Sequence, residues 1–365
     1  MHMEFFPSRM LTVYLARLFI VRILAVLVML VLVLMMLDLL GQSGDILAYP
    51  GNGQAQLLEY ASMRVPQLIA RFLPYSVLLA TIITLATLNQ NSEVIAMKAA
   101  GLSAHQVLAP LILTALVVSI ASFVFNERVV TRATATLSAW EAVDYGVVPK
   151  DSGVRSNVYL NDGRDILMAA TVTGQGDRME MRSVTYYRRD EKGMVVEQMR
   201  ADRAVYAGPG WRLERPVRFD VASAQSTPLA SAEVARGITP AQVSMSRVDA
   251  DALDIFALSD SIAALKAEGR RTTELEAAWW HKLSGPLSAL LMPLLGAVAA
   301  FGLARSGQLL IRAVIGMALG FAYFVIDNAA LAMGNFGGYP PMVAAWAPFL
   351  LFALVGETVL IRTEE

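Results

Sequence analysis

The chain has 365 residues, a formal net charge of -1, three histidines and no cysteine. Hydrophobic residues make up 56% of it, charged residues make up only 17%, and the mean hydropathy is +0.50, which is typical of a membrane protein. The balanced charge provides no basic footprint for nucleic acid. The lack of cysteine excludes disulfides, thiolate metal sites and a cysteine nucleophile.

Six segments are apolar enough to span a bilayer, because a spanning helix needs about 20 apolar residues. They lie at 18–40, 66–88, 107–125, 283–303, 309–333 and 342–361. The first resembles a signal peptide, but its apolar run over 23–37 is long for one and no small-residue cleavage site follows it. We therefore expect an uncleaved anchor and six transmembrane helices.

Basic residues in the short loops predict the orientation of these helices, since lysine and arginine favour the cytoplasmic side. One side carries Arg9, Arg17, Lys98, Arg305 and Arg362, whereas the short loops of the other side carry only Arg64. Both termini are therefore predicted in the cytoplasm. The long segment between the third and fourth helices is predicted outside.

Residues 126–276 have the composition of a soluble domain. Short runs rich in Val, Tyr, Ile and Met predict strands at 157–160, 166–172, 183–187, 194–199, 204–206 and 217–221. Turn residues separate them at 162–163, 190–193 and 208–210. We expect an all-β, jelly-roll-like domain, followed by a short helix over 259–268. The predicted organisation is thus 1–125, 126–276 and 277–365.

The sequence lacks the motifs of an enzyme. No phosphate-binding loop occurs, so any ATP dependence must come from a partner. His2, His105 and His281 are far apart and fit no metal-ligand spacing, so no metal site is expected. Residues 41–44 do not match a nucleophile elbow. These absences predict a non-catalytic chain that binds no cofactor itself.

The connection between the second and third spans predicts a short surface helix at about 92–100. Ser92 is expected to cap it, Glu93 suits its positive end, and Gly101 ends it. Three apolar side chains are expected to be exposed there: Val94, Ile95 and Met97. They fit the groove of a partner protein, and equally a connector that lies on lipid headgroups.

Arg128 and Arg132 lie four residues apart at the outer end of the third helix, so their side chains are expected on one face. Guanidinium groups match phosphate oxygens, so this pair is a candidate lipid contact. The alternative is that they only anchor the end of the helix.

Among the ionisable residues within the spans, where a charge is costly, three are candidates for a specific role. Arg71 and Asp327 are expected to pair and to join helices 2 and 5, although contact with a ligand is an alternative. Glu357 is close enough to the cytoplasmic end of the last helix to reach the interface.

Two helices carry candidate lipid-contacting side chains. Methionine adapts to irregular apolar partners such as acyl chains, and helix 1 carries Met29, Met35 and Met36. Helix 5 carries large side chains at Phe321, Tyr323, Phe324 and Ile326. Of these, Met35, Phe321 and Phe324 are the lipid-binding candidates, and ordinary helix packing is the alternative.

Several stretches occur together in a characteristic order. They are 91–101 after helix 2, 249–258 with Leu265 and Gly269, 280–283 with 286–288, 320–327, and 338–341. In this order and spacing, the chain resembles the LptF/LptG family of permease subunits of the lipopolysaccharide export transporter. The LptG branch is the closer match and the LptF branch the alternative.

The resemblance implies a function and a set of partners. Two related permeases, LptG-like and LptF-like, would pair with an LptB-like ABC ATPase dimer that uses ATP and Mg. Together they would extract lipopolysaccharide from the outer leaflet of the bacterial inner membrane. The outer jelly roll would pass its acyl chains to a periplasmic bridge of LptC-like and LptA-like proteins. A scaffold that moves no lipid and a lipid-modifying enzyme are the alternatives from other classes.

The resemblance also implies roles for residues. Glu93 would face an arginine of the ATPase, Val94 and Met97 would sit in its groove, and helices 1 and 5 would form one side of a lateral gate. One feature departs from the family: residues 34–44 contain Asp38 and no basic residue, where well-known members carry lysines. Arg128 and Arg132 are therefore expected to supply the phosphate contact, unless the natural glycolipid carries fewer phosphates.

Overall fold

The computed structural model describes residues 7–141, 144–146, 155–174, 176–240, 243, 249–267, 269–301 and 309–364. His2 and Arg305 lie outside these residues. The chain divides into two compact units. One comprises Met1–Gly41, Arg64–Thr131 and Leu253–Glu365, and the other comprises Gln42–Met63 and Arg132–Ala252.

The helices are longer than the predicted spans. They are α1 (Arg9–Ala48), α2 (Gln54–Gln90), α3 (Glu93–Ala99), α4 (Ala104–Phe125), α5 (Thr131–Glu141), α7 (Ile255–Ala267), α8 (Thr273–Phe301), α9 (Leu309–Asn335) and α10 (Pro341–Glu364). A π-helical turn, η1 (Asn126–Val130), joins α4 to α5. Residues 126–141, expected in the β domain, are therefore helical.

Five helices among the described residues are long and apolar enough to cross a membrane: α1, α2, α4 with its continuation to Glu141, α9 and α10. The predicted fourth span, 283–303, lies on α8, and its last two residues fall outside the described part of the chain. A crossing by α8 therefore stays a prediction. The five helices nevertheless give the chain the build of a multi-pass membrane protein.

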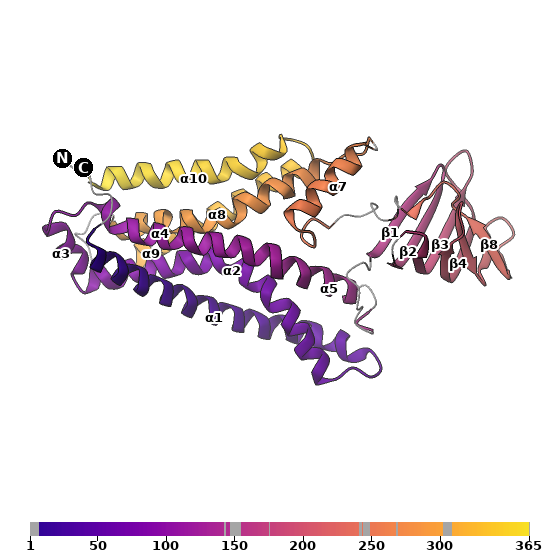
Figure 1. The fold of residues 1–365 in the computed structure, drawn as a ribbon, viewed down its shortest axis with the longest axis horizontal. Helices are drawn as coiled ribbons and strands as arrows, with labels where there is room; N and C mark the ends of the chain where they lie inside the picture. The colour runs from indigo at the N-terminus through magenta and orange to yellow at the C-terminus, as the bar shows by residue number, and fades with distance from the viewer. Residues whose placement is uncertain are drawn as a thin grey trace. The chain divides into compact units, whose positions relative to one another are not determined.

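Helix α8 is central to the packing of the first unit, where it contacts α4, α9 and α10 (Figure 1). Ser119 on α4 donates a hydrogen bond to the Pro286 carbonyl on α8 at 2.8 Å. On the other side, Arg22 of α1 donates to the Ile83 carbonyl of α2 at 3.1 Å. These bonds satisfy polar groups that lipid cannot satisfy.

The second unit contains one antiparallel sheet. Its strands are β1 (Arg155–Asp162), β2 (Asp165–Thr173), β3 (Glu180–Arg189), β4 (Val195–Tyr206), β5 (Trp211–Glu214), β6 (Val217–Asp220), β7 (Gln225–Pro228) and β8 (Ser231–Val234). The main order is β1-β2-β3-β4-β5-β8, while β6 pairs with β4 and β7. The predicted strand-rich segment is thus an antiparallel sheet, and its jelly-roll arrangement stays a prediction.

The strand boundaries differ from the predicted ones in two ways. The runs at 194–199 and 204–206 form one strand, β4, which pairs with β3 along both runs and has one register shift between Arg188 and Arg189. Three strands of four residues each were not predicted: β5, β7 and β8. The turns at Gly163 and Gly193 adopt positive φ as expected.

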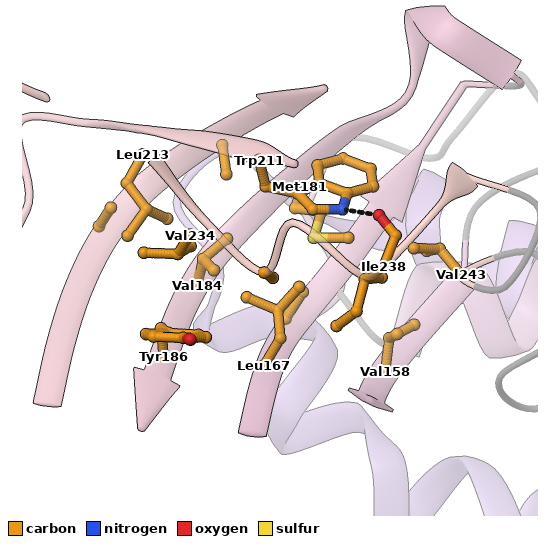
Figure 2. Close-up of a cluster of buried hydrophobic side chains, with 14 of the residues drawn as sticks. Val158, Leu167, Met181, Val184, Tyr186, Trp211, Leu213, Val234, Ile238 and Val243 are labelled. Carbon is orange, nitrogen blue, oxygen red and sulfur yellow. Dashed lines mark hydrogen bonds between the residues drawn. The ribbon is translucent and has the colours of Figure 1, made fainter. Parts of the chain in front are cut away.

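The buried hydrophobic side chains of the sheet form a core that includes Trp211 (Figure 2). Its indole is fully buried and donates a hydrogen bond to the Ile238 carbonyl at 3.0 Å. At another point of the core, Tyr186 donates to the Asp165 carboxylate at 2.7 Å. Burial, followed by this hydrogen bond, raises the pKa of Tyr186. The hydroxyl is therefore kept neutral as a donor.

Candidate coupling helix and lipid-facing surfaces

Helix α3 lies where the sequence predicts it, but its start differs. Ser92 has a left-handed backbone, with φ of 61°, and its side chain caps nothing. The predicted Ser92 cap is therefore wrong. The helix ends at Ala99, and Gly101 follows its C-cap with a positive φ of 87°, as expected for a terminating glycine. Ser103 then starts α4 with a capping box that includes Gln106.

The faces of α3 also differ from the prediction. Val94 and Met97 are only 4% and 8% exposed, so the expectation that both are surface side chains is wrong. They lie on the side of α3 that is buried within the chain, because positions three apart share a helix face. Ile95 is instead 62% exposed and stands next to the exposed Ala96. The apolar side chain that α3 offers to a partner is thus Ile95.

Glu93 is held at the start of α3 by two donors. The Tyr14 hydroxyl of α1 donates to its carboxylate at 3.1 Å, and the Asn91 amide donates at 3.3 Å. The carboxylate keeps part of its surface open. It therefore ties α1 to α3 and still has capacity to accept another donor.

Several chain segments meet at the α3 end of the first unit (Figure 1). The Tyr14 contact brings the beginning of α1 there. At the beginning of α4, the His105 ring lies 2.9 Å from the Glu357 carboxylate near the end of α10. The starts of α1 and α4 and the end of α10 therefore lie on one side of the bundle, as the basic-residue pattern requires.

The predicted lipid contacts fall into two classes. Arg128 in η1 and Arg132 in α5 are exposed, and the guanidinium group of neither forms an ion pair or hydrogen bond with any part of the chain that the structure describes. Phe321 is also exposed, at 64%. These three side chains are free to meet a ligand.

Met35 and Phe324 are buried, which contradicts a direct lipid role in this conformation. Phe324 stacks on Tyr75 of α2 with ring centroids 3.9 Å apart, so it packs between helices. Helix α1 exposes Met29 and Met36 in place of Met35. Both α1 and α9 carry long exposed apolar faces, which include Leu24, Val28, Leu32, Leu40, Val314, Ile315 and Val325.

The expected pair between Arg71 and Asp327 is not formed. Asp327 of α9 is buried and lies 3.1 Å from the His281 ring of α8. Arg71 is exposed and makes no ion pair within the described residues. Through its pair with His281, the buried Asp327 carboxylate joins α9 to α8, which correspond to the fifth and fourth predicted helices.

Asp38, the residue that departs from the family, forms a forked ion pair with Arg64. The two guanidinium nitrogens lie 3.0 and 3.1 Å from the two carboxylate oxygens. This geometry is the strong, directional form of the interaction. Asp38 therefore holds α1 to α2, and the guanidinium group of Arg64 is occupied by this pair.

The sequence did not predict one buried ion pair, between Glu127 and Lys282. Glu127 in η1 and Lys282 in α8 are 11% and 7% exposed, and their charged atoms lie 3.4 Å apart. A signal for it existed, since both residues flank apolar spans. Within the described residues, no group of three or more His, Asp or Glu side chains could hold a metal ion.

Comparison with known proteins places these features in a family. Residues 13–362 match the model of the lipopolysaccharide export system permease LptF/LptG. The lipopolysaccharide export system permease protein LptG of Escherichia coli K12 is 25% identical over 83% of this chain and 84% of its own length. LptG of Haemophilus influenzae is 23% identical over 85% and 87%, respectively. The chain therefore belongs to the LptF/LptG family of lipopolysaccharide export system permeases, and the relatives it resembles are LptG proteins.

Proposed function

We propose that this chain is the LptG-type permease subunit of an ATP-driven lipopolysaccharide exporter. The observation that carries the proposal is the family match across residues 13–362, which includes the helices and the sheet domain together. ATP and Mg would be used by an LptB-like ATPase dimer, and an LptF-like permease would complete the membrane part. LptC-like and LptA-like proteins would receive the lipid.

The proposed orientation has α3 and both termini in the cytoplasm of a bacterium, and the sheet domain in the periplasm. The clustering of α3 with the ends of α1 and α10 supports a common side for these segments, and the basic residues support the cytoplasm as that side. Helix α3 would then receive the motion of the ATPase through Ile95 and Glu93.

The exposed apolar faces of α1 and α9 support a lateral gate for the lipid. Lipid chains would lie against side chains such as Met36 and Phe321, which no part of the described chain covers. Closure of the gate on ATP binding would expel the acyl chains, because the apolar surface that held them is then buried between the permeases.

The experiment that tests this function begins with purification of the tagged chain from its native membranes in mild detergent. Mass spectrometry is expected to find a second six-helix permease, a small ATPase and a multi-acyl glycolipid. The complex in proteoliposomes should then release lipopolysaccharide to a soluble acceptor only when ATP is added. Recovery of the chain alone, repeated after crosslinking, would contradict the proposal and favour a scaffold or an enzyme.

The pair Arg128 and Arg132 provides a test of headgroup recognition. Replacing both with glutamine is expected to reduce co-purified lipopolysaccharide about thirtyfold, because two charge-assisted contacts worth about 1 kcal/mol each are lost. Lipid bound per complex is measured by mass spectrometry, and Arg17→Gln, on the side proposed to face the cytoplasm, serves as an exposed arginine control. Unchanged lipid in the double variant would mean that both arginines only anchor the helix.

A further inference from the structure

The chain returns from the sheet domain through α7, and the first residue of α7 is held by two other helices. The backbone N–H of Ile255 donates to Glu127 Oε2 at 2.6 Å. The carbonyl of the same residue accepts from the Trp279 indole of α8 at 3.3 Å. Both backbone groups of Ile255 are thus bound outside α7.

The remaining free N–H groups of α7 are satisfied locally. Asp254 accepts from Phe256 and Ala257 through its side chain, and from Leu258 through its carbonyl. A helix leaves four such donors at its start. Glu127 therefore supplies the one acceptor that comes from a distant part of the chain, and its negative charge also suits the positive end of α7.

The other oxygen of Glu127 faces Lys282, with Nζ and Oε1 3.4 Å apart. Lys282 is almost fully buried, and a lone ammonium in that position would be costly. One carboxylate thus joins three elements: η1, α7 and α8. Deeper in the bundle, Ser119 and Pro286 join α4 to α8 a second time, so α4 and α8 are tied together at two depths.

Glu127 occupies the π-helical turn at which α4 passes into α5. Such turns are rare and occur frequently at functional sites. The turn buries Glu127 and exposes its neighbour Arg128. At its other end, α4 begins beside α3. A displacement of α3 would therefore travel along α4 to Glu127.

We propose that Glu127 is a positioning residue of the transport cycle, whose carboxylate transmits the movement of α3 and α4 to α7 and to the exposed Arg128. This inference rests on the proposed function. Lipid release then depends on the contacts of Glu127 with α7 and α8, although Glu127 itself touches neither the ATPase nor the lipid.

The decisive variant replaces both charged side chains with apolar ones, Glu127→Leu with Lys282→Met, which also removes the acceptor of the Ile255 N–H. Removing one charge alone would leave the other buried without a partner, whereas removal of both is often neutral for stability. The complex of permeases and ATPase is reconstituted in proteoliposomes, and ATP hydrolysis and ATP-dependent lipopolysaccharide release are measured together. Asp260→Asn, an exposed carboxylate on the same α7, is the matched control.

We expect the double variant to keep its melting temperature and its rate of ATP hydrolysis. The lipid released per ATP hydrolysed should fall about tenfold, which lies within the range of energetic coupling that is usual between two sites of one protein. A merely structural role would change the melting temperature and leave this ratio as it is. A stable double variant with the wild-type ratio would overturn the inference alone, whereas a wild-type complex that releases no lipid would overturn the proposed function as well.

A distance measurement provides a second readout for a double variant that assembles poorly. The chain has no cysteine, so spin labels can be placed at the exposed positions Val129 and Asp260 once cysteines of the partner subunits are replaced. The distance between them should stay narrow through the nucleotide cycle in the otherwise wild-type chain and broaden in the double variant. An equally narrow distribution in both would show that Glu127 does not hold α7.

Discussion

Ile95→Asp is expected to reduce the ATPase that co-purifies with the permease by more than about tenfold. Tenfold corresponds to about 1.4 kcal/mol, and a buried carboxylate without a partner costs more than that. Ile95 is the large exposed apolar side chain of α3, and its replacement leaves the buried Val94 and Met97 in place. Association is measured by quantitative mass spectrometry of the purified complex, with Ile95→Val as the control that keeps the apolar surface.

Glu93→Arg should produce the same loss if the carboxylate faces a basic residue of the ATPase. The substitution also removes the acceptor of the Tyr14 hydroxyl, so Tyr14→Phe is the matched control. That control loses the internal bond and keeps the charge, and it should retain the ATPase. If Glu93→Arg binds the ATPase and releases lipid as the wild type does, Glu93 takes no part in coupling. Loss of the ATPase in both variants would instead assign Glu93 to the connection between α1 and α3.

Trp211→Ala is expected to destabilise the sheet domain by about 3–5 kcal/mol, the usual cost of removing a large aromatic side chain from a core. Trp211 is fully buried, stacks edge-on to Tyr206 and binds the Ile238 carbonyl (Figure 2). A domain with an ordinary stability of about 5–15 kcal/mol would lose a large share of it. Thermal unfolding of the full chain in detergent measures the effect.

Trp211→Phe separates the two contributions of this side chain. It keeps most of the apolar volume and loses the indole donor, so about 1–3 kcal/mol should be lost when the Ile238 carbonyl is left without its partner. Tyr159→Ala on the exposed face of β1 is the surface control and should change little. Equal stability of Trp211→Ala and wild type would mean that the core around Trp211 does not determine the stability of the domain.

The exposed side of α3 illustrates where sequence reasoning stops. A helix at about 92–100 was predictable because an acidic first turn and a terminal glycine are local signals. Which of its apolar residues is exposed depends on how α3 rotates against its neighbours, which no local signal determines. The same limit explains Met35 and Phe324, which were predicted to meet lipid and lie buried.

For the charged residues in the helices, too, the sequence predicts the need for a partner but not its identity. A charge in the membrane interior costs free energy, so each such residue is expected to pair or to reach an interface. Asp38, Asp327 and Glu357 each have a partner. The identity of the partners required the packing. Asp327 meets His281 and not Arg71, since pairs form between side chains at equal depth on adjoining helices, and sequence distance carries little information about either.

The sequence by itself determined the membrane class, the inserted β domain, the short helix between the second and third spans and the family resemblance. All of these rest on composition, local periodicity and the order of motifs along the chain. Only the tertiary structure decided that Ile95 is the exposed side chain of α3, that Asp38 binds Arg64, and that Glu127 joins η1 to α7 and α8. The physical reason is that burial and ion pairing are set by contacts between segments up to 252 residues apart, whereas helices and strands follow from their own residues.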